Sequence, residues 1–228
     1  MFVQASLVNV LLCAAMIPLL SSCQSNPSKA GATSTSTQRK GPISFPNTPT
    51  PHPLPSVPEM KVPSLLPDDR ITIDGKLDEA AWQRAASTGE FVNVGNGAAN
   101  ENQTLGGSVL LTWDRTYLYV AFAIHDTDIR GDFAADAGDP HLWTESTVEI
   151  MIDPDGDGDN VDYYEIQIGP QNLVFDSQFD GYNQPRVTPN GPFGHQEWTS
   201  EVRSAVTLHG TLNESKGRDD GYVVEAQI

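Results

Sequence analysis

Cysteine is scarce in this sequence: the 228 residues contain only Cys13 and Cys23, both near the amino terminus. The rest of the chain can therefore form neither a disulfide nor a thiolate metal site. Positive charge is also scarce, with 13 Lys and Arg against 30 Asp and Glu and a formal net charge of −17. This balance excludes electrostatic attraction to nucleic acid or to an anionic bilayer as the basis of function.

Residues 7–20 form an apolar run that is too short to span the ~30 Å of hydrocarbon in a bilayer. Leu20-Ser21-Ser22-Cys23 follows directly, and this order resembles a bacterial lipoprotein signal with its lipobox. The resemblance implies a signal peptide at residues 1–22 and stable membrane anchoring by acyl chains on Cys23. Gln24 follows the cysteine where an Asp would favour inner-membrane retention. We therefore expect an outer-membrane lipoprotein facing the periplasm or the cell surface. The alternative is an uncleaved anchor or a buried helix.

Residues 23–67 have almost nothing apolar to bury. Ser, Thr, Gln and Asn give way to nine prolines between Pro42 and Pro67. Such a composition is typical of a disordered linker whose Pro-rich half is extended. We expect this segment to hold the folded domain, residues 68–228, away from the membrane.

The acidic segment from Ile71 onward has the pattern of an all-β protein, with short β-branched and aromatic runs between turn residues. In residues 117–126 apolar residues alternate with others, so one side of that strand is expected to face the core. One or two helical turns are expected at residues 79–86, where Asp78 can cap the exposed amides. The sequence thus predicts an antiparallel β-sandwich, with its other strands at residues 108–113, 147–153, 162–168, 173–179, 198–208 and 222–228.

An acidic loop lies between two of these strands. Asp153, Asp155 and Asp157 match the first half of an EF-hand, in which alternate carboxylates converge on a hard cation. The second half does not match, because Tyr164 stands where a bidentate Glu is needed. The loop is either a strand-borne calcium site or a solvated hairpin turn. The candidate ligands are Asp153, Asp155, Asp157, Asp159 and Asp162.

The two strands beside the loop carry polar residues with the same periodicity. Glu149 alternates with core residues on the first strand, and Glu165 and Gln167 alternate with Ile166 and Ile168 on the second. If the strands pair, these side chains line one polar surface beside Trp143. An indole flanked by carboxylates and an amide suits a sugar, whose ring face stacks while its hydroxyls donate hydrogen bonds. Taken alone, a tryptophan such as Trp143 is more often a packing residue.

Five segments in order resemble a family 9 carbohydrate-binding module: ITIDGKLDEAAW at 71–82, LTWDRTYLYVAF from 111, LWTESTVEIMIDPDGDG at 142–158, YYEIQI at 163–168 and GYVVEAQI at 221–228. The resemblance implies a DOMON-like β-sandwich, bound calcium and a slot that clamps the end sugar of a glycan between two tryptophans. Trp143 matches the first clamp tryptophan and Glu149 a hydroxyl-binding glutamate. Glu165 and Gln167 occupy positions where xylanase-linked members have an arginine and an asparagine.

Domains of this family typically continue past the last of these segments with strands that carry the second clamp tryptophan. We therefore expect either a fragment or a domain whose slot has one wall. Trp113, Trp198 or Tyr182 could supply another aromatic, although Trp113 and Trp82 are better interpreted as core residues. The overall expectation is a lipid-anchored domain that recognises a glycan without turning it over and supports polysaccharide binding or catabolism.

Two other functions remain as alternatives. Related sandwiches hold a b-type haem through an axial Met with His or Lys. The nominal ligands here are Met151 with His125, His141, His195 or His209. A glycoside hydrolase would need two carboxylates ~5 to 9.5 Å apart, and the available ones are Glu145, Glu149, Glu165 and Asp176. No spacing in the sequence selects either set.

Overall fold

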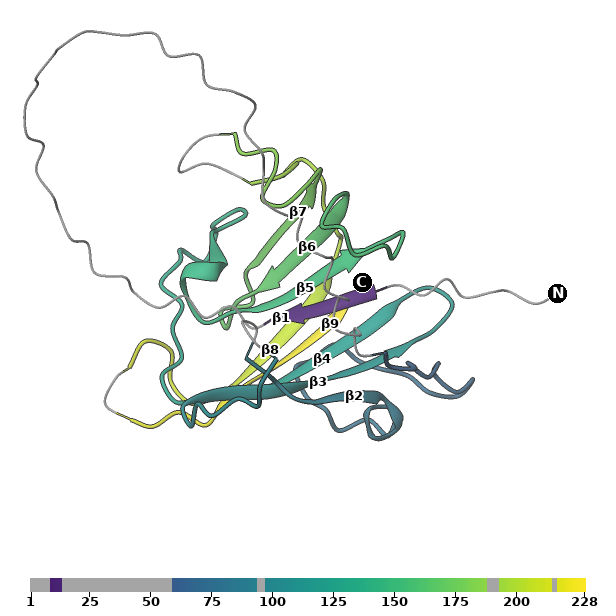
Figure 1. The fold of residues 1–228 in the computed structure, drawn as a ribbon. Helices are drawn as coiled ribbons and strands as arrows, with labels where there is room; N and C mark the ends of the chain where they lie inside the picture. Colours follow the sequence, from purple (N-terminus) through teal and green to yellow (C-terminus); the bar gives the residue numbers. More distant parts are fainter. Residues whose placement is uncertain (1–8, 14–58, 94–96, 188–192, 215–216) are drawn as a thin grey trace, which may run out of the picture. The chain divides into compact units, whose positions relative to one another are not determined.

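The computed structural model describes residues 9–13, 59–93, 97–187, 193–214 and 217–228, and they form the two antiparallel sheets of a β-sandwich (Figure 1). This confirms the predicted fold class. The first sheet has the order β1 (Asn9–Cys13), β5 (Val148–Asp153), β6 (Tyr163–Ile168) and β7 (Val174–Phe179). The second has the order β2 (Ala86–Glu90), β3 (Leu105–Trp113), β4 (Leu118–Asp126), β9 (Gly221–Gln227) and β8 (Arg203–His209).

The main core lies between the two sheets, where strand alternation directs apolar side chains inward. On β4 the inward residues include Val120, Phe122 and Ile124, as their spacing predicted. They share a cluster with Ile150 of β5 and Ile166 of β6. Burying one such side chain stabilises the folded state by ~1.5 to 3 kcal/mol relative to leaving it exposed to water. The same alternation turns the intervening residues of β5 and β6 to the opposite side of their sheet, where the candidate site lies.

Most predicted strands are present, but the segment before β8 is not extended. The prediction placed a strand at residues 198–208, whereas β8 begins at Arg203. Glu201 has a left-handed φ of 52°, which interrupts a strand. Ser200 instead holds the chain in a loop by donating its backbone N–H and its hydroxyl to Asp176. Strand β2 was not predicted at all.

The predicted helix at residues 79–86 is also largely wrong. Only a 3-10 turn, η1 (Trp82–Arg84), forms there, and Asp78 does not cap it. The alanines favour helix, but Ala86 already pairs with Leu111 as the first residue of β2. Tertiary pairing therefore overrides local propensity.

Glu225 of β9 fixes the segment that covers the outer face of the five-stranded sheet. Its carboxylate is fully buried and accepts hydrogen bonds from the backbone N–H groups of Asp74, Gly75 and Lys76. It also accepts one from the indole Nε1 of Trp82 at 2.8 Å. Trp82 is thus a core residue, as predicted. Trp113 is not, because 37% of its surface is exposed at the end of β3.

Strand β1 lies in the segment that was expected to be a leader. Asn9–Cys13 lies beside β5 and pairs antiparallel with it (Figure 1). The register places Cys13 opposite Glu149. The edge of β5 presents unpaired backbone groups, which a short extended segment can satisfy. Cys23 and the predicted linker up to residue 58 lie outside the described residues. In the part of the chain that is described, no helix is long and apolar enough to cross a membrane.

Candidate functional site

The outer face of β5, β6 and β7 brings together the polar residues that the sequence singled out. The strand register places Glu149 opposite Gln167 and Met151 opposite Glu165. The side-chain amide Nε2 of Gln167 donates to Glu165 Oε1 and, at 3.3 Å, to Glu149 Oε1. Gln167 and Glu165 are buried, while Glu149 is half-buried. We call these three side chains the carboxyl–amide cluster.

Electrostatics within this cluster are dominated by burial. Loss of hydration, together with the neighbouring Glu149 carboxyl, raises the pKa of Glu165 to about 9. The Glu165 carboxyl therefore keeps its proton near neutral pH.

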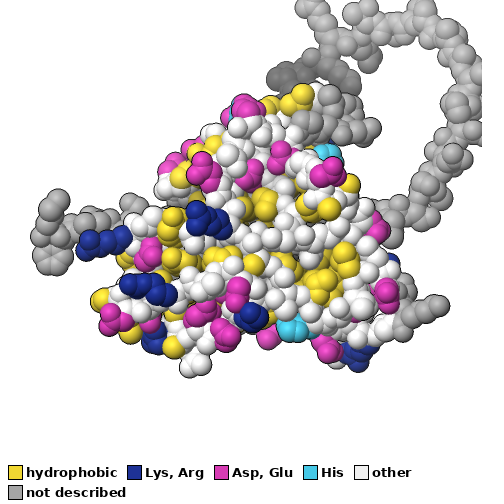
Figure 2. All heavy atoms as spheres, turned by 180° about the vertical axis from the view of Figure 1, so that it is seen from behind, with side chains coloured by type: hydrophobic (Ala, Val, Ile, Leu, Met, Phe, Trp, Pro, Cys, Tyr) yellow, Lys and Arg dark blue, Asp and Glu magenta, His cyan; other side chains and the backbone are white. Residues whose placement is uncertain are grey.

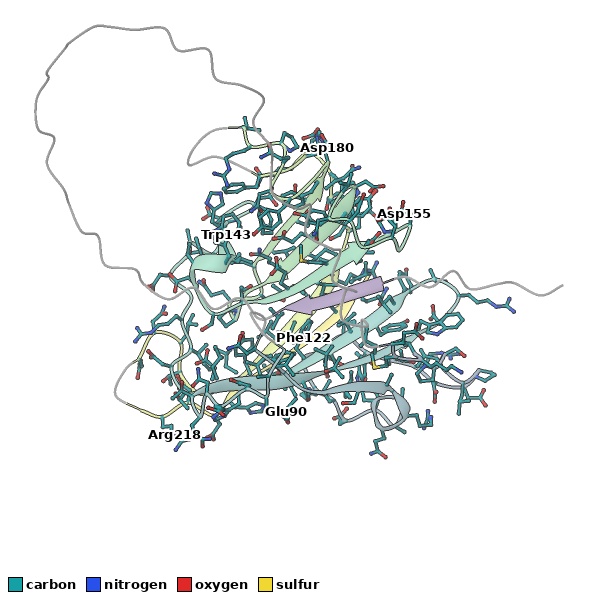
Figure 3. The ribbon with its side chains drawn as sticks, viewed as in Figure 1. Glu90, Phe122, Trp143, Asp155, Asp180 and Arg218 are labelled. Carbon is teal, nitrogen blue, oxygen red and sulfur yellow. The ribbon has the colours of Figure 1, made fainter. Side chains whose placement is uncertain are left out.

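Trp143 lies in the 3-10 turn η2 (Leu142–Thr144) that packs over this sheet (Figure 3). It is half-buried. His141 stacks on its ring with centroids 4.3 Å apart, and Phe175 and Phe193 meet it edge-on at 5.2 and 5.4 Å. The result is an aromatic group next to the carboxyl–amide cluster, supported by a second, smaller core around Tyr163, Phe175 and Phe179.

The aromatic partners of Trp143 were not predicted from the sequence. Phe175 could have been found, because Phe175, Ser177 and Phe179 alternate on a predicted strand and must share one face. Phe193 and His141 lie in loops, where no periodicity signals their position. Arg186 lies 4.7 Å above the Phe193 ring, so a cation also belongs to this loop.

The proposed second aromatic residues are spread over the molecule. Trp198 packs against Tyr164 with centroids 4.7 Å apart, and Tyr164 alternates away from Glu165, so Trp198 does not face Trp143. Trp113 belongs to the other sheet. Tyr182 is 71% exposed, and its neighbour Asn183 donates its backbone N–H to the Tyr163 hydroxyl beside the cluster. Of the three, Tyr182 is the one linked to this face.

The acidic loop after β5 gathers three of the five predicted metal ligands. Carboxylate oxygens of Asp153, Asp155 and Asp157 lie within 4.8 Å of one another, and Figure 3 shows Asp155 at the loop tip. This acidic group could hold a metal ion, because convergent carboxylates suit hard cations. Asp159 and Asp162 are not part of it. The Asp159 carboxylate instead accepts the Val161 N–H at 2.8 Å.

Contacts within the loop shift the pKa values of two of its carboxyl groups in opposite directions. Backbone N–H groups of Gly156 and Gly158 lower the pKa of Asp153, to which they donate at 2.9 and 2.8 Å. The adjacent Asp153 side chain, assisted by Asp157, raises the pKa of Asp155. A bound cation would relieve this repulsion between neighbouring carboxylates.

The family of this domain follows from a match between its sequence and a known family. The sequence profile of the carbohydrate family 9 binding domain-like family matches residues 73–228, which is more than half of the chain. The chain belongs to this family. No curated protein matches the chain. Membership confirms the resemblance inferred from the five sequence segments and assigns the domain to carbohydrate binding.

The match to this family of binding domains suggests a non-catalytic module. Among the carboxylates considered for a hydrolase, Glu149 and Glu165 both accept hydrogen bonds from the side-chain amide of Gln167. Asp176 lies on the other side of β7 and is held by Ser200, and Glu145 ends the η2 turn.

The nominal haem ligands are likewise separated in this family 9 domain. Met151 is on the four-stranded sheet, whereas His125 and His209 are on the other. Both ring nitrogens of His125 contact carbonyl oxygens, of Asp220 and Gln103, at 3.2 Å. His195 is engaged by Asp180 and Glu197, and His141 stacks on Trp143. The structure thus brings no histidine to Met151 among the described residues.

The family 9 domain has a hollow of about 730 Å³ on the outer face of β3 and β4, far from Trp143 in the topology. Gly106, Ser108 and Ala123 form its floor and Glu90 and Arg218 its rim (Figure 3). Seen from behind, acidic side chains are spread among basic ones, so this face of the molecule offers no continuous basic surface (Figure 2).

Proposed function

We propose that the domain recognises a glycan, at a chain end, on the outer face of β5, β6 and β7, and that it supports polysaccharide binding without turnover. The observation that carries the proposal is the juxtaposition of half-buried Trp143 with the carboxyl–amide cluster in a family of carbohydrate-binding domains. The apolar face of a sugar ring stacks on an indole, and its hydroxyls donate to carboxylate and amide oxygens. A chain end fits this site better than a chain middle because the loop residues His141 and Phe193 flank Trp143.

A glycan array probed with the full chain, with and without a chelator, tests this proposal. We expect binding to a subset of glycans that share a terminal residue. Competition by the free monosaccharide of that terminal residue would identify end recognition, whereas binding only to internal chain segments would contradict it. Absence of binding to any glycan by folded protein would overturn the function.

We further propose that calcium occupies the acidic loop, with Asp153, Asp155 and Asp157 as ligands. Two features support the fit: three converging carboxylate oxygens, and glycine amides that orient Asp153. Bound calcium would supply a fixed positive charge that rigidifies the connection between β5 and β6, and both strands carry the sugar site. Strands β5 and β6, joined by this loop, would then position Glu149 and Glu165.

Chelation is expected to lower the melting temperature of the protein. A cation that binds only the native state at ~100 times its Kd stabilises it by about 2.7 kcal/mol, or roughly 5 to 10 °C for a domain of this size. Thermal unfolding followed by circular dichroism, with and without chelator, measures the shift. Asp155→Asn with Asp157→Asn should abolish it. Asp159→Asn is the matched control and should retain it. If the wild-type unfolding curves with and without chelator are identical, the loop is a solvated hairpin turn and not a calcium site.

We also propose that the protein is a lipoprotein anchored through Cys23 to the outer membrane. The support comes from the sequence alone, since Cys23 lies outside the described residues. It consists of the lipobox order and of Gln24 after the cysteine. Such an anchor would hold the glycan-binding domain at the cell surface or in the periplasm, where polysaccharides are encountered.

Cys23→Ser is expected to abolish acylation while leaving the β-sandwich folded, because that thiol is the acceptor in the lipobox. Incorporation of radiolabelled palmitate in cells measures the result. Cys13→Ser is the matched control and should keep the label. Undiminished labelling of the Cys23 variant would contradict the anchor.

A further inference from the structure

Gln167 has an acceptor that no protein group satisfies. Its side chain is 2% exposed, and both N–H donors of its amide are used by Glu149 and Glu165. Its carbonyl Oε1 is buried and has no hydrogen-bond partner among the described residues. A buried acceptor without a partner destabilises a fold by about 1–3 kcal/mol. This oxygen lies on the face proposed for the sugar, beside Glu149 and Glu165, where a ligand that donates to it would remove that cost.

The rest of the carboxyl–amide cluster consists of acceptors and negative charge. In the described part of the chain no Lys, Arg or His forms an ion pair with Glu149 or Glu165. The basic groups on the loops packed over this face are committed elsewhere: His195 to Asp180, Arg186 to the Phe193 ring and His141 to Trp143. The Tyr163 phenol also neighbours the cluster, and burial raises its pKa to about 12, so it stays neutral.

We propose that the sugar recognised here presents a free amino group, as a terminal glucosamine does, to Glu149, Glu165 and Gln167 Oε1. This inference rests on the proposed glycan binding and specifies its ligand class. An ammonium group has three donors and no acceptor, and the cluster offers three acceptors with a net negative charge. A hydroxyl brings one donor and no charge, an N-acetyl group removes the charge, and a uronic acid is repelled.

The amine changes the protonation of the cluster when it binds. Before binding, the buried Glu165 carboxyl holds a proton near neutral pH, because burial raises its pKa to about 9. An adjacent ammonium favours the charged form of this carboxyl, so its proton leaves for the solvent while the ammonium keeps its three. No bond to carbon or oxygen of the sugar is made or broken. Binding near neutral pH should therefore release about one proton per site.

Three β-1,4-linked trisaccharides separate the amine from the other groups: the deacetylated glucosamine trimer, its fully N-acetylated form and cellotriose. Isothermal titration calorimetry with the full chain should give at least tenfold tighter binding of the glucosamine trimer, equivalent to about 1.4 kcal/mol. Repeating the titration in two buffers of different ionisation enthalpy measures the released proton. Cellotriose and the acetylated trimer should release none.

Glu165→Gln should remove both the preference and the proton release, because it keeps the size of the side chain without its titration. Glu201→Gln is the matched control, an exposed glutamate outside the site, and it reports the general attraction of a cationic sugar to a chain with net charge −17. Glu149→Gln, at a half-buried position, replaces Glu165→Gln if that variant does not fold.

Cellotriose binding as tightly as the glucosamine trimer would overturn this inference and leave glycan binding intact. A preference that survives in the Glu165 variant, or equally disappears in the Glu201 variant, would also overturn it. If the folded chain binds none of the three sugars and no glycan on the array, this inference and the proposed function both fail.

Discussion

Glu225→Ala is expected to lower the free energy of unfolding by about 3 kcal/mol or more. The carboxylate accepts hydrogen bonds from three backbone N–H groups and from the Trp82 indole in a fully buried position. Each buried donor left without an acceptor costs about 1–3 kcal/mol, reduced where water can enter. Chemical denaturation followed by tryptophan fluorescence measures the change.

Two further variants make this result interpretable. Glu225→Gln keeps one acceptor oxygen and should lie between the wild type and the alanine variant. Glu90→Ala removes an exposed glutamate from the same sheet and should change stability by no more than about 0.5 kcal/mol. If Glu225→Ala were as stable as Glu90→Ala, the buried carboxylate would not be what fixes the segment from Asp74 to Trp82.

Trp143→Ala is expected to weaken glycan binding at least about thirtyfold, equivalent to about 2 kcal/mol, because aromatic anchors dominate such sites. The domain should remain folded. Trp143 is half-buried, so its loss should destabilise the fold by less than the ~3 to 5 kcal/mol typical of a core tryptophan. Calorimetry and thermal unfolding of the same variant give both quantities.

Trp113→Ala is the matched control for this experiment. Trp113 is 37% exposed, lies on the other sheet and donates its indole N–H to the Val62 carbonyl. Its removal should leave glycan affinity unchanged. Intact affinity in the Trp143 variant, or equal losses in both variants, would show that Trp143 is a packing residue and not the sugar platform.

The sandwich and the polar part of the site could be predicted because strand alternation has a strict period. Once β5 and β6 pair, Glu149, Glu165 and Gln167 must share a face, and the observed register places Glu149 directly opposite Gln167. The structure also explains the glycine that opens the segment GYVVEAQI. A Cβ on Gly221 would lie 1.8 Å from the Ile124 carbonyl oxygen, so glycine is required where β9 begins.

The features that could not be predicted depend on contacts between distant segments. Nothing local marks Phe193 as a neighbour of Trp143, because the two lie in loops separated by β5, β6 and β7. Alanine-rich residues 79–86 favour helix locally, yet Trp82 is held by Glu225 and Ala86 by β3. Asp159 and Asp162 carry the right ligand atoms, but among the described residues only the carboxylate oxygens of Asp153, Asp155 and Asp157 converge within 4.8 Å of one another.

Mapping a bound sugar onto individual residues tests the central claim most directly. Isotope-labelled protein titrated with a saccharide selected on the array should show its largest NMR chemical-shift changes at the Trp143 indole, the Gln167 side-chain amide and backbone amides of β5 and β6. Gly106, Ser108 and Ala123, on the floor of the hollow over β3 and β4, should be unaffected. Shifts confined to those three residues, with Trp143 and Gln167 unchanged, would contradict the assignment of the outer face of β5, β6 and β7 as the glycan site.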